Sequence, residues 1–192
     1  MRVGVLALQG AFAEHIRMLQ RLDVDARPIR LPEQLDGLDG LVIPGGESTT
    51  IGKLMVFFNL LDKLRCIIAD GLPVFGTCAG MIVLAKRTSQ DCDQPLIGAM
   101  DVVVRRNGFG RQVDSFETDL SISCLGDAPF RAVFIRAPYI ESVGSKVSII
   151  ASLPDGKTVA ARQGNLLVSA FHPELGADPR FHQYYLDMAS AR

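Results

Sequence analysis

One cysteine of the chain stands in a segment that could make it a nucleophile. Cys78 lies in Gly76-Thr77-Cys78-Ala79-Gly80, after an apolar run typical of a strand and before an apolar run, residues 81–85, typical of a helix. A sharp strand-to-helix turn of this kind is the nucleophile elbow of many hydrolases, here with cysteine in place of serine. Small neighbours allow the tight turn, and a helix N-terminus favours the thiolate. The turn alone leaves open whether Cys78 is a nucleophile or a buried structural cysteine.

A thiolate nucleophile needs a base that later protonates the leaving group, and His172 could be that base. It follows the strand-like residues 166–171 and can therefore approach the same edge of the sheet as Cys78. Glu174 could orient the imidazole of His172. By itself the tripeptide His-Pro-Glu also suits an ordinary turn, but beside a nucleophile elbow it favours catalysis.

The other histidines and cysteines are not assigned to catalysis. His15, in the first amphipathic helix, and His182, in the last helix, are expected to be exposed. Cys66 has apolar neighbours and is expected to be a buried structural residue. No Cys-x-x-Cys pair occurs, so free thiols are predicted at all four positions, which are Cys66, Cys78, Cys92 and Cys124.

Two further groups of residues could bind a substrate. The segment Gly45-Gly46-Glu47-Ser48-Thr49-Thr50 follows an apolar strand, and its glycines could present a backbone N–H to an oxyanion, although it could equally be only the start of a helix. Arg105-Arg106 and Arg136 lie at the ends of apolar strands and could hold a carboxylate. Taken by themselves, these arginines are more simply read as solvated.

The pattern of apolar runs predicts an α/β fold. Short Val- and Ile-rich runs, typical of buried strands, alternate with helical patterns in the first half, which indicates a parallel sheet. Asp155-Gly156, between residues 149–153 and 158–161, predicts a hairpin and an added antiparallel section. A last helix is expected over residues 180–191. We expect one three-layer, doubly wound domain over residues 1–192.

Composition narrows the function to small-molecule chemistry. The net charge is −1 and 48% of the residues are hydrophobic, so neither disorder nor binding to nucleic acid or anionic lipid is indicated. The N-terminal apolar run reads as a strand rather than a signal peptide, and no apolar stretch approaches the roughly 20 residues that cross a bilayer. We therefore expect a cytoplasmic protein.

Together these residues resemble a known family. Cys78 in Gly-Thr-Cys-Ala-Gly and His172-Pro173-Glu174 resemble the triad of class I glutamine amidotransferases, which implies glutaminase activity and a flavodoxin-like sheet. More particular segments resemble the glutaminase subunits of pyridoxal 5'-phosphate synthases, over nearly the whole chain. These segments are Leu-Gln-Gly at 8–10, Pro-Gly-Gly-Glu-Ser-Thr-Thr at 44–50, Arg-Asn-Gly-Phe-Gly-Arg-Gln-Val-Asp-Ser-Phe at 106–116, Ile-Arg-Ala-Pro at 135–138 and Phe-His-Pro-Glu-Leu at 171–175.

The resemblance implies that the chain releases ammonia from L-glutamine, without metal or organic cofactor, and passes it through a tunnel to a separate synthase subunit. Backbone N–H groups of Ala79 and Gly46 are expected to form the oxyanion hole, and Gln9 is expected near the subunit interface. The residues implied in glutamine binding are Gly46, Glu47, Ser48, Arg106, Ile135 and Arg136.

Three alternatives stay open at this point. A glutaminase subunit of histidine or purine synthesis would share the triad but not the segment at 107–116. A non-catalytic α/β regulatory module would have little need of Cys78, His172 and Glu174 together. A cysteine hydrolase or peptidase acting on another amide is not excluded by the elbow alone.

Overall fold

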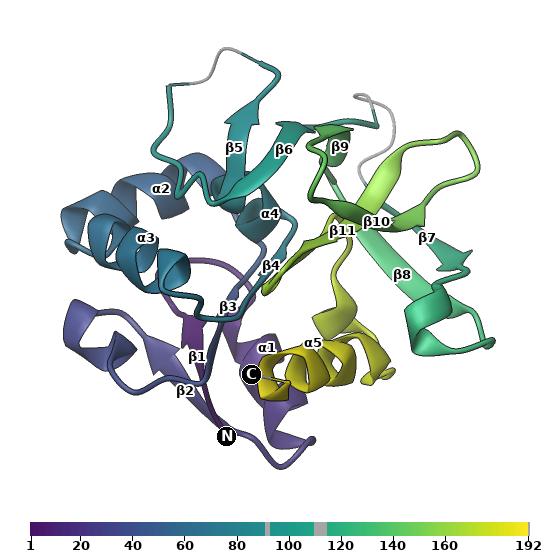
Figure 1. Ribbon diagram of the computed structural model, residues 1–192. Coiled ribbons are helices and arrows are strands. Elements are labelled where there is room, and N and C mark those ends of the chain that lie inside the picture. Colours follow the sequence, from purple (N-terminus) through teal and green to yellow (C-terminus); the bar gives the residue numbers. More distant parts are fainter. Residues whose placement is uncertain (91–92, 110–114, 192) are drawn as a thin grey trace.

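A parallel sheet forms the centre of the protein (Figure 1). The computed structural model describes residues 1–90, 93–109 and 115–191. The parallel strands lie in the order β2-β1-β3-β4-β12. Their bounds are β1 Arg2–Leu6, β2 Asp25–Ile29, β3 Gly40–Ile43, β4 Val74–Thr77 and β12 Leu166–Ser169. Every residue of β3, β4 and β12 is buried, as expected for strands that are covered on both faces.

Antiparallel pairing extends this sheet beyond β12. Strand β11 pairs antiparallel with β12, β10 and β9, and β9 pairs antiparallel with β6, which is parallel to β5. Strands β7 and β8 form a separate antiparallel pair. The bounds are β5 Ala85–Thr88, β6 Met100–Arg105, β7 Ser115–Leu120, β8 Phe130–Ile135, β9 Tyr139–Val143, β10 Ser148–Ser152 and β11 Thr158–Gln163. The predicted hairpin is thus confirmed as β10 and β11.

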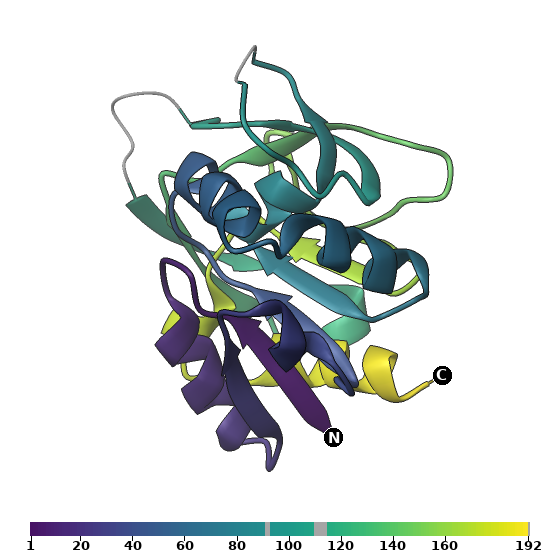
Figure 2. The same cartoon turned by 90° about the vertical axis from the view of Figure 1, so that its left-hand side faces the viewer.

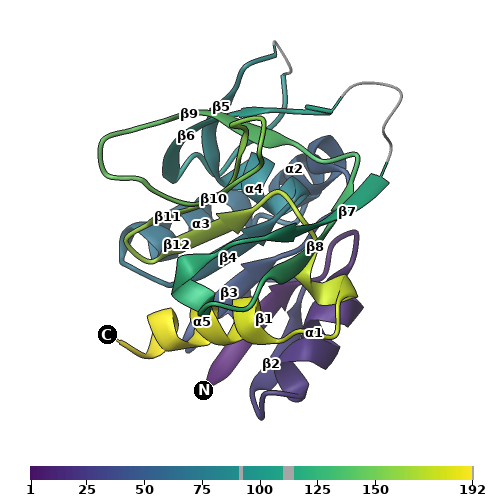
Figure 3. The same ribbon diagram turned by 90° about the vertical axis from the view of Figure 1, so that its right-hand side faces the viewer.

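Helices cover both faces of the parallel strands. Figure 3 shows α1 and α5 in front of these strands and α2 and α3 behind them, and Figure 2 shows the side that carries α2 and α3. The doubly wound α/β prediction is therefore confirmed. The bounds are α1 Phe12–Gln20, α2 Ser48–Phe57, α3 Leu61–Ala69, α4 Ala79–Leu84 and α5 Arg180–Ser190, with short 3-10 helices η1 Pro32–Leu35, η2 Ser123–Leu125 and η3 Pro173–Leu175.

The last helix shows how sequence pattern and packing agree. Helix α5 starts after Pro179, and Asp178 Oδ1 accepts a hydrogen bond from the backbone N–H of Arg180. The helix buries Phe181, Tyr185 and Met188 against the sheet. The predicted last helix is therefore confirmed.

The structure corrects the prediction for one cysteine. Cys66 is exposed rather than buried, because α3 turns Leu64 and Ile68 toward the core and Cys66 away from it. Cys78 and Cys124 are also free thiols, whereas Cys92 lies outside the described residues.

Within the described ranges, no helix is long and apolar enough to cross a membrane. The single domain and the cytoplasmic location stay predictions from the sequence.

We predict that Tyr185→Phe destabilises the fold. The buried Tyr185 hydroxyl lies 3.1 Å from the carbonyl oxygen of Leu41 and 3.2 Å from that of Pro73, so it ties α5 to the sheet. Losing this buried hydrogen bond should cost about 1–2 kcal/mol in the free energy of unfolding, measured by urea denaturation. Tyr184→Phe is the comparison: its half-buried hydroxyl accepts one hydrogen bond from Arg162 Nη1 at 3.1 Å near the surface, so its loss should cost less than that of the buried Tyr185 hydroxyl. Equal effects of the two substitutions would contradict the prediction.

Candidate active site

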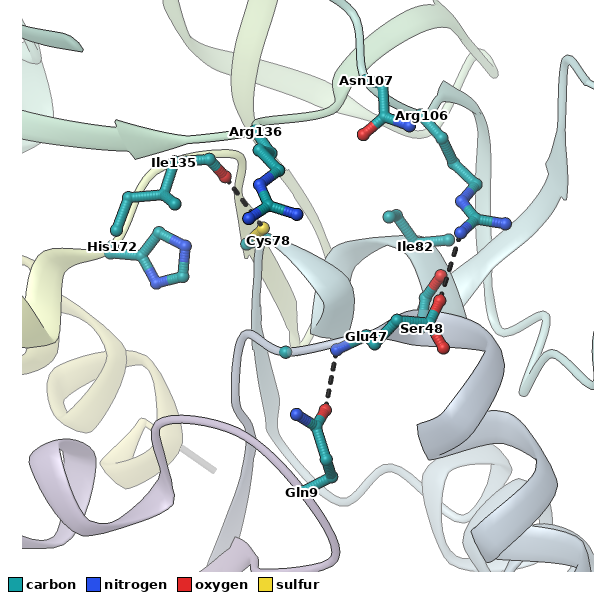
Figure 4. Close-up of a pocket in the computed structure, with 11 residues that line it drawn as sticks. Gln9, Glu47, Ser48, Cys78, Ile82, Arg106, Asn107, Ile135, Arg136 and His172 are labelled. Atoms are coloured by element: carbon teal, nitrogen blue, oxygen red, sulfur yellow. Dashed lines mark hydrogen bonds and ion pairs between the residues drawn. The ribbon is translucent and has the colours of Figure 1, made fainter. Parts of the chain in front are cut away.

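A pocket of about 460 Å³ opens at the carboxyl edge of the parallel strands (Figure 4). Ligands of doubly wound folds gather at this edge, and the volume suits a small molecule. The residues that line the pocket are Gln9, Gly46, Glu47, Ser48, Cys78, Ile82, Arg106, Asn107, Ile135, Arg136 and His172. The structure therefore brings together every predicted substrate residue, and with them Cys78 and His172.

The backbone at Cys78 forms the sharp turn predicted from the sequence. Cys78 has φ +49° and ψ −100°, a strained conformation for a residue with a side chain, and it directly precedes α4. Its N–H donates to the carbonyl oxygen of Ser169 on β12, which anchors the turn to the sheet. Gly80 is required here, since a Cβ at this position would lie 2.0 Å from the carbonyl oxygen of Ile43. The geometry of the turn is therefore set by contacts with neighbouring strands.

His172 lies beside Cys78, with Gly45 packed against both. A Cβ on Gly45 would come within 2.4 Å of His172 Cε1 and 3.4 Å of Cys78 Cβ, so only glycine allows this approach. On its other side, His172 Nδ1 is 2.7 Å from Oε1 of Glu174. All three of Cys78, His172 and Glu174 are buried. The predicted nucleophile, base and orienting carboxylate thus form one connected row.

The charges in this row favour a protonated His172 and an ionised Glu174. Burial alone would lower the pKa of His172, but hydrogen bonds and charge from Cys78 and Glu174 outweigh it and raise this pKa to about 10. Burial would raise the pKa of Glu174, yet the adjacent imidazoles of His15 and His172 keep that pKa below its ordinary value. At neutral pH an imidazolium therefore lies next to the sulfur of Cys78, with an ionised carboxylate behind it.

The opposite wall of the pocket is polar. Glu47 caps α2 by accepting hydrogen bonds from the backbone N–H groups of Thr49 and Thr50. Although burial would raise the pKa of Glu47, these hydrogen bonds, together with one from the Thr50 hydroxyl, lower the pKa to about 2. Arg106 Nη2 lies 3.2 Å from Glu47 Oε1. Arg106 is therefore paired and lies in the wall of the pocket.

Gln94 supports this wall, and no sequence pattern pointed to it. Its buried Oε1 accepts hydrogen bonds from Ser48 Oγ at 3.1 Å and Thr49 Oγ1 at 3.0 Å, and Arg106 Nη1 donates to it at 3.4 Å. A lone glutamine in a loop carries no sequence signal for such a role. Asn107, with φ +47°, also lines the pocket and was not assigned.

The third wall comes from the end of β8. Cys78 Sγ lies 4.0 Å from the carbonyl oxygen of Ile135, and Arg136 follows with φ +41°. Ile135 and Arg136 are both exposed and both line the pocket (Figure 4). Residues 110–114 of the segment that resembles the family lie outside the described residues.

The prediction that the other histidines are exposed is wrong. His15 and His182 are both fully buried, because α1 and α5 turn these residues toward the sheet and toward each other. His15 also lies 3.3 Å from Glu174 Oε2. The helical pattern of apolar residues, which repeats every 3.6 positions, counts histidine as polar. It therefore cannot reveal that His15 and His182 are buried together. Among the described residues no cluster of three or more His, Cys, Asp or Glu side chains could hold a metal ion.

Comparison with known proteins identifies the family. Residues 5–191 match the model of the SNO glutamine amidotransferase family. The chain belongs to this family. A relative from Herpetosiphon aurantiacus, "Pyridoxal 5'-phosphate synthase subunit PdxT", is 60% identical over 190 residues, which cover 98% of this chain and 100% of the relative.

Solved structures agree with this assignment. A crystal structure described as a glutamine amidotransferase superposes with a TM-score of 0.93 at 49% identity and covers 98% of this chain and 99% of its own. A putative GMP synthase protein from Thermoplasma acidophilum gives a TM-score of 0.70 at 17% identity, covering 100% and 94% of the two chains. The second likeness shows only that the fold is shared, so the family assignment rests on the first and on the sequence relatives.

We predict that Cys78 reacts with iodoacetamide at a pH where ordinary thiols do not. The His172 imidazolium beside it should persist up to about pH 10 and favour the thiolate. At pH 6.5 alkylation of Cys78, followed by peptide mapping, should be at least about tenfold faster than that of an unstructured cysteine peptide, since only ~1% of an ordinary thiol is ionised there. His172→Ala should remove this advantage. An unchanged alkylation rate of Cys78 in His172→Ala would show that the imidazolium of His172 does not activate this thiol.

Proposed function

We propose that the chain is the glutaminase subunit of a pyridoxal 5'-phosphate synthase. It hydrolyses L-glutamine to L-glutamate and ammonia and delivers the ammonia to a separate synthase subunit. The observation that carries this proposal is the connected row of Cys78, His172 and Glu174 at the floor of the pocket. The relatives named as pyridoxal 5'-phosphate synthase subunits supply the partner and the pathway.

The first step forms a bond between the enzyme and the substrate. The thiolate of Cys78 attacks the side-chain carboxamide carbon of glutamine and gives a tetrahedral oxyanion. Backbone N–H groups of Ala79 and Gly46 stabilise this oxyanion. The C–N bond then breaks, the His172 imidazolium gives its proton to the leaving nitrogen, and ammonia departs. A γ-glutamyl thioester on Cys78 is left.

The second step releases glutamate. His172, now neutral, accepts a proton from a water molecule as this water attacks the thioester carbon. The C–S bond breaks, glutamate leaves, and the thiolate and imidazolium are restored. Glu174 keeps the ring of His172 oriented in both steps through the hydrogen bond to Nδ1. No metal or organic cofactor takes part in these steps.

The polar walls of the pocket suit the remainder of glutamine. Glu47 and Ser48, which follow Gly46 in the pocket lining, lie on one side of Cys78, and Ile135 and Arg136 lie on another (Figure 4). Glu47 is a carboxylate that can pair with the substrate ammonium group. The guanidinium groups of Arg106 and Arg136 can pair with the substrate carboxylate. The pocket thus offers both charges that an amino acid substrate requires.

The rival glutaminase assignments have less support. Proteins of purine synthesis share the fold, as the GMP synthase protein illustrates, but that likeness is only 17% identical. A regulatory module would not require an imidazolium next to a free buried thiol. A peptidase would need room for chain on both sides of the scissile bond, whereas this pocket has a volume of about 460 Å³.

We predict that Cys78→Ala abolishes glutamate formation while the fold persists. The substitution removes the nucleophile but changes the buried volume little, so the melting temperature of the variant should stay close to that of the wild type. Glutamate release should be measured in the presence of the synthase subunit. Cys66→Ala, at an exposed site, is the matched control and should keep full turnover. Residual wild-type turnover in Cys78→Ala would overturn the assigned nucleophile.

We also predict that the synthase subunit raises glutaminase turnover. Gln9 Oε1 accepts a hydrogen bond from the backbone N–H of Glu47 at 2.7 Å, next to the Gly45-Gly46 turn. A partner that docks near Gln9 can therefore move this backbone into its oxyanion-binding form, which is worth roughly 10²- to 10³-fold in kcat for one donor. Glutamate release should be compared with and without the synthase subunit. Equal rates would contradict this coupling.

A further inference from the structure

A second pair of imidazoles lies behind Glu174, away from the pocket. His15 on α1 places Nε2 3.3 Å from Oε2 of Glu174 and 3.1 Å from Oγ1 of Thr77. Its other nitrogen, Nδ1, lies 2.9 Å from Nε2 of His182 on α5. Both rings are fully buried beside Phe75. The row of polar groups that begins at Cys78 therefore continues through Glu174 to His15 and His182.

Both of these histidines are neutral. Burial lowers the pKa of His15, and this effect outweighs the attraction of Glu174. Burial and the neighbouring His15 lower the pKa of His182 to about 3. Each ring then carries a single proton on one of its two nitrogens, so one N–H is available to each histidine.

The contacts decide where these protons lie. His182 Nδ1 has no hydrogen-bond partner among the residues that the structure describes. A buried N–H without an acceptor is costlier than a bare lone pair, so the proton of His182 belongs on Nε2 and is donated to His15 Nδ1. His15 must then carry its own proton on Nε2, which donates to Thr77 Oγ1 at 3.1 Å and lies 3.3 Å from Glu174 Oε2. The opposite arrangement would direct a lone pair of His15 at a negative charge.

We propose that His15 is a positioning residue that holds the Glu174 carboxylate for His172, and that His182 sets the tautomer of His15. The proposal rests on the function proposed above. Oε1 of Glu174 accepts from His172, and His15 Nε2 lies 3.3 Å from Oε2 without a hydrogen bond to it, so imidazoles pack against the carboxylate on both sides. Neither His15 nor His182 lines the pocket, so neither touches the substrate.

The donor from His15 also stabilises the charge of Glu174. The ionisable groups around this carboxylate are His172 and His15, with His182 behind them and Glu14 next to His15 on α1. Without the His15 donor, Glu174 should take up a proton at a higher pH. When Glu174 is neutral, the imidazolium of His172 loses its stabilising charge and returns its proton to the sulfur of Cys78. The reactivity of Cys78 should then be lost at a higher pH than in the wild type.

The test compares His15→Leu, which removes the donor, with His15→Gln, which restores an N–H at a similar reach. The rate of Cys78 alkylation by iodoacetamide is measured from pH 4.5 to 8 on the folded chain. We expect the acid limb of the pH–rate profile of His15→Leu to lie about one pH unit higher than in the wild type, a roughly fivefold loss of alkylation rate at the wild-type midpoint. His15→Gln should stay closer to the wild type. A loss of packing shared by the two variants would lower both alkylation rates by a constant factor, without shifting the acid limb along the pH axis.

Two results would overturn the proposal: an unmoved limb in His15→Leu, or equal shifts in His15→Leu and His15→Gln. If His15→Leu does not fold, ring ¹⁵N chemical shifts of the wild type decide the matter. They should show His15 and His182 neutral and protonated on Nε2 at pH 7. A charged His15, or a proton on its Nδ1, would refute the assignment.

Turnover gives a second readout. In the presence of the synthase subunit, His15→Leu should lower kcat for glutamine about tenfold, because Glu174 loses the polar contact at Oε2, with KM little changed. An unchanged kcat would count against the proposal. If the wild type itself releases no glutamate, the proposed function fails, whereas the alkylation profiles still decide the role of His15 because they involve no glutamine.

Discussion

The buried negative charge of Glu174 is the constraint on which the arrangement of the site depends. Its side chain is fully enclosed, and an unpaired carboxylate in such a place would be protonated rather than charged. Imidazoles meet it from two sides, His172 after β12 and His15 on α1. Because α1 carries His15 and α5 carries His182, the packing of these two helices against the sheet affects the charge of Glu174 at the floor of the pocket.

The floor and the rim of the pocket differ in how firmly they are held. The floor is set by backbone: Cys78 has a strained φ, and Gly45 and Gly80 let neighbouring chains approach it closely. The rim is made of half-exposed side chains, among them Glu47 and Arg106, joined by hydrogen bonds. Such a division allows the rim to adjust to a substrate or partner while the reacting atoms stay in place.

Sequence patterns predicted most of the architecture because buried parallel strands and amphipathic helices leave strong periodic signals. Strands β2, β5, β7 and β9 were not predicted, since they contain charged, exposed residues and no continuous apolar run. Cys78 and His172 could be found because each follows an apolar strand. The buried state of His15 could not, because it depends on a contact with His182, 167 residues further along the chain. Gln94 was missed for the same reason, since its partners Ser48 and Thr49 lie 46 and 45 positions away.

The distribution of the site along the chain has a consequence for folding. Cys78 follows β4, whereas His172 and Glu174 follow β12, which lies far along the chain and pairs parallel with β4. A chain in which β12 has not yet paired with β4 thus carries the thiol without its proton donor. Pairing between such distant parallel strands is slow, because loop-closure entropy must be overcome first. The elbow alone therefore leaves the thiol inert, and reactivity arises only with the long-range contacts of the sheet.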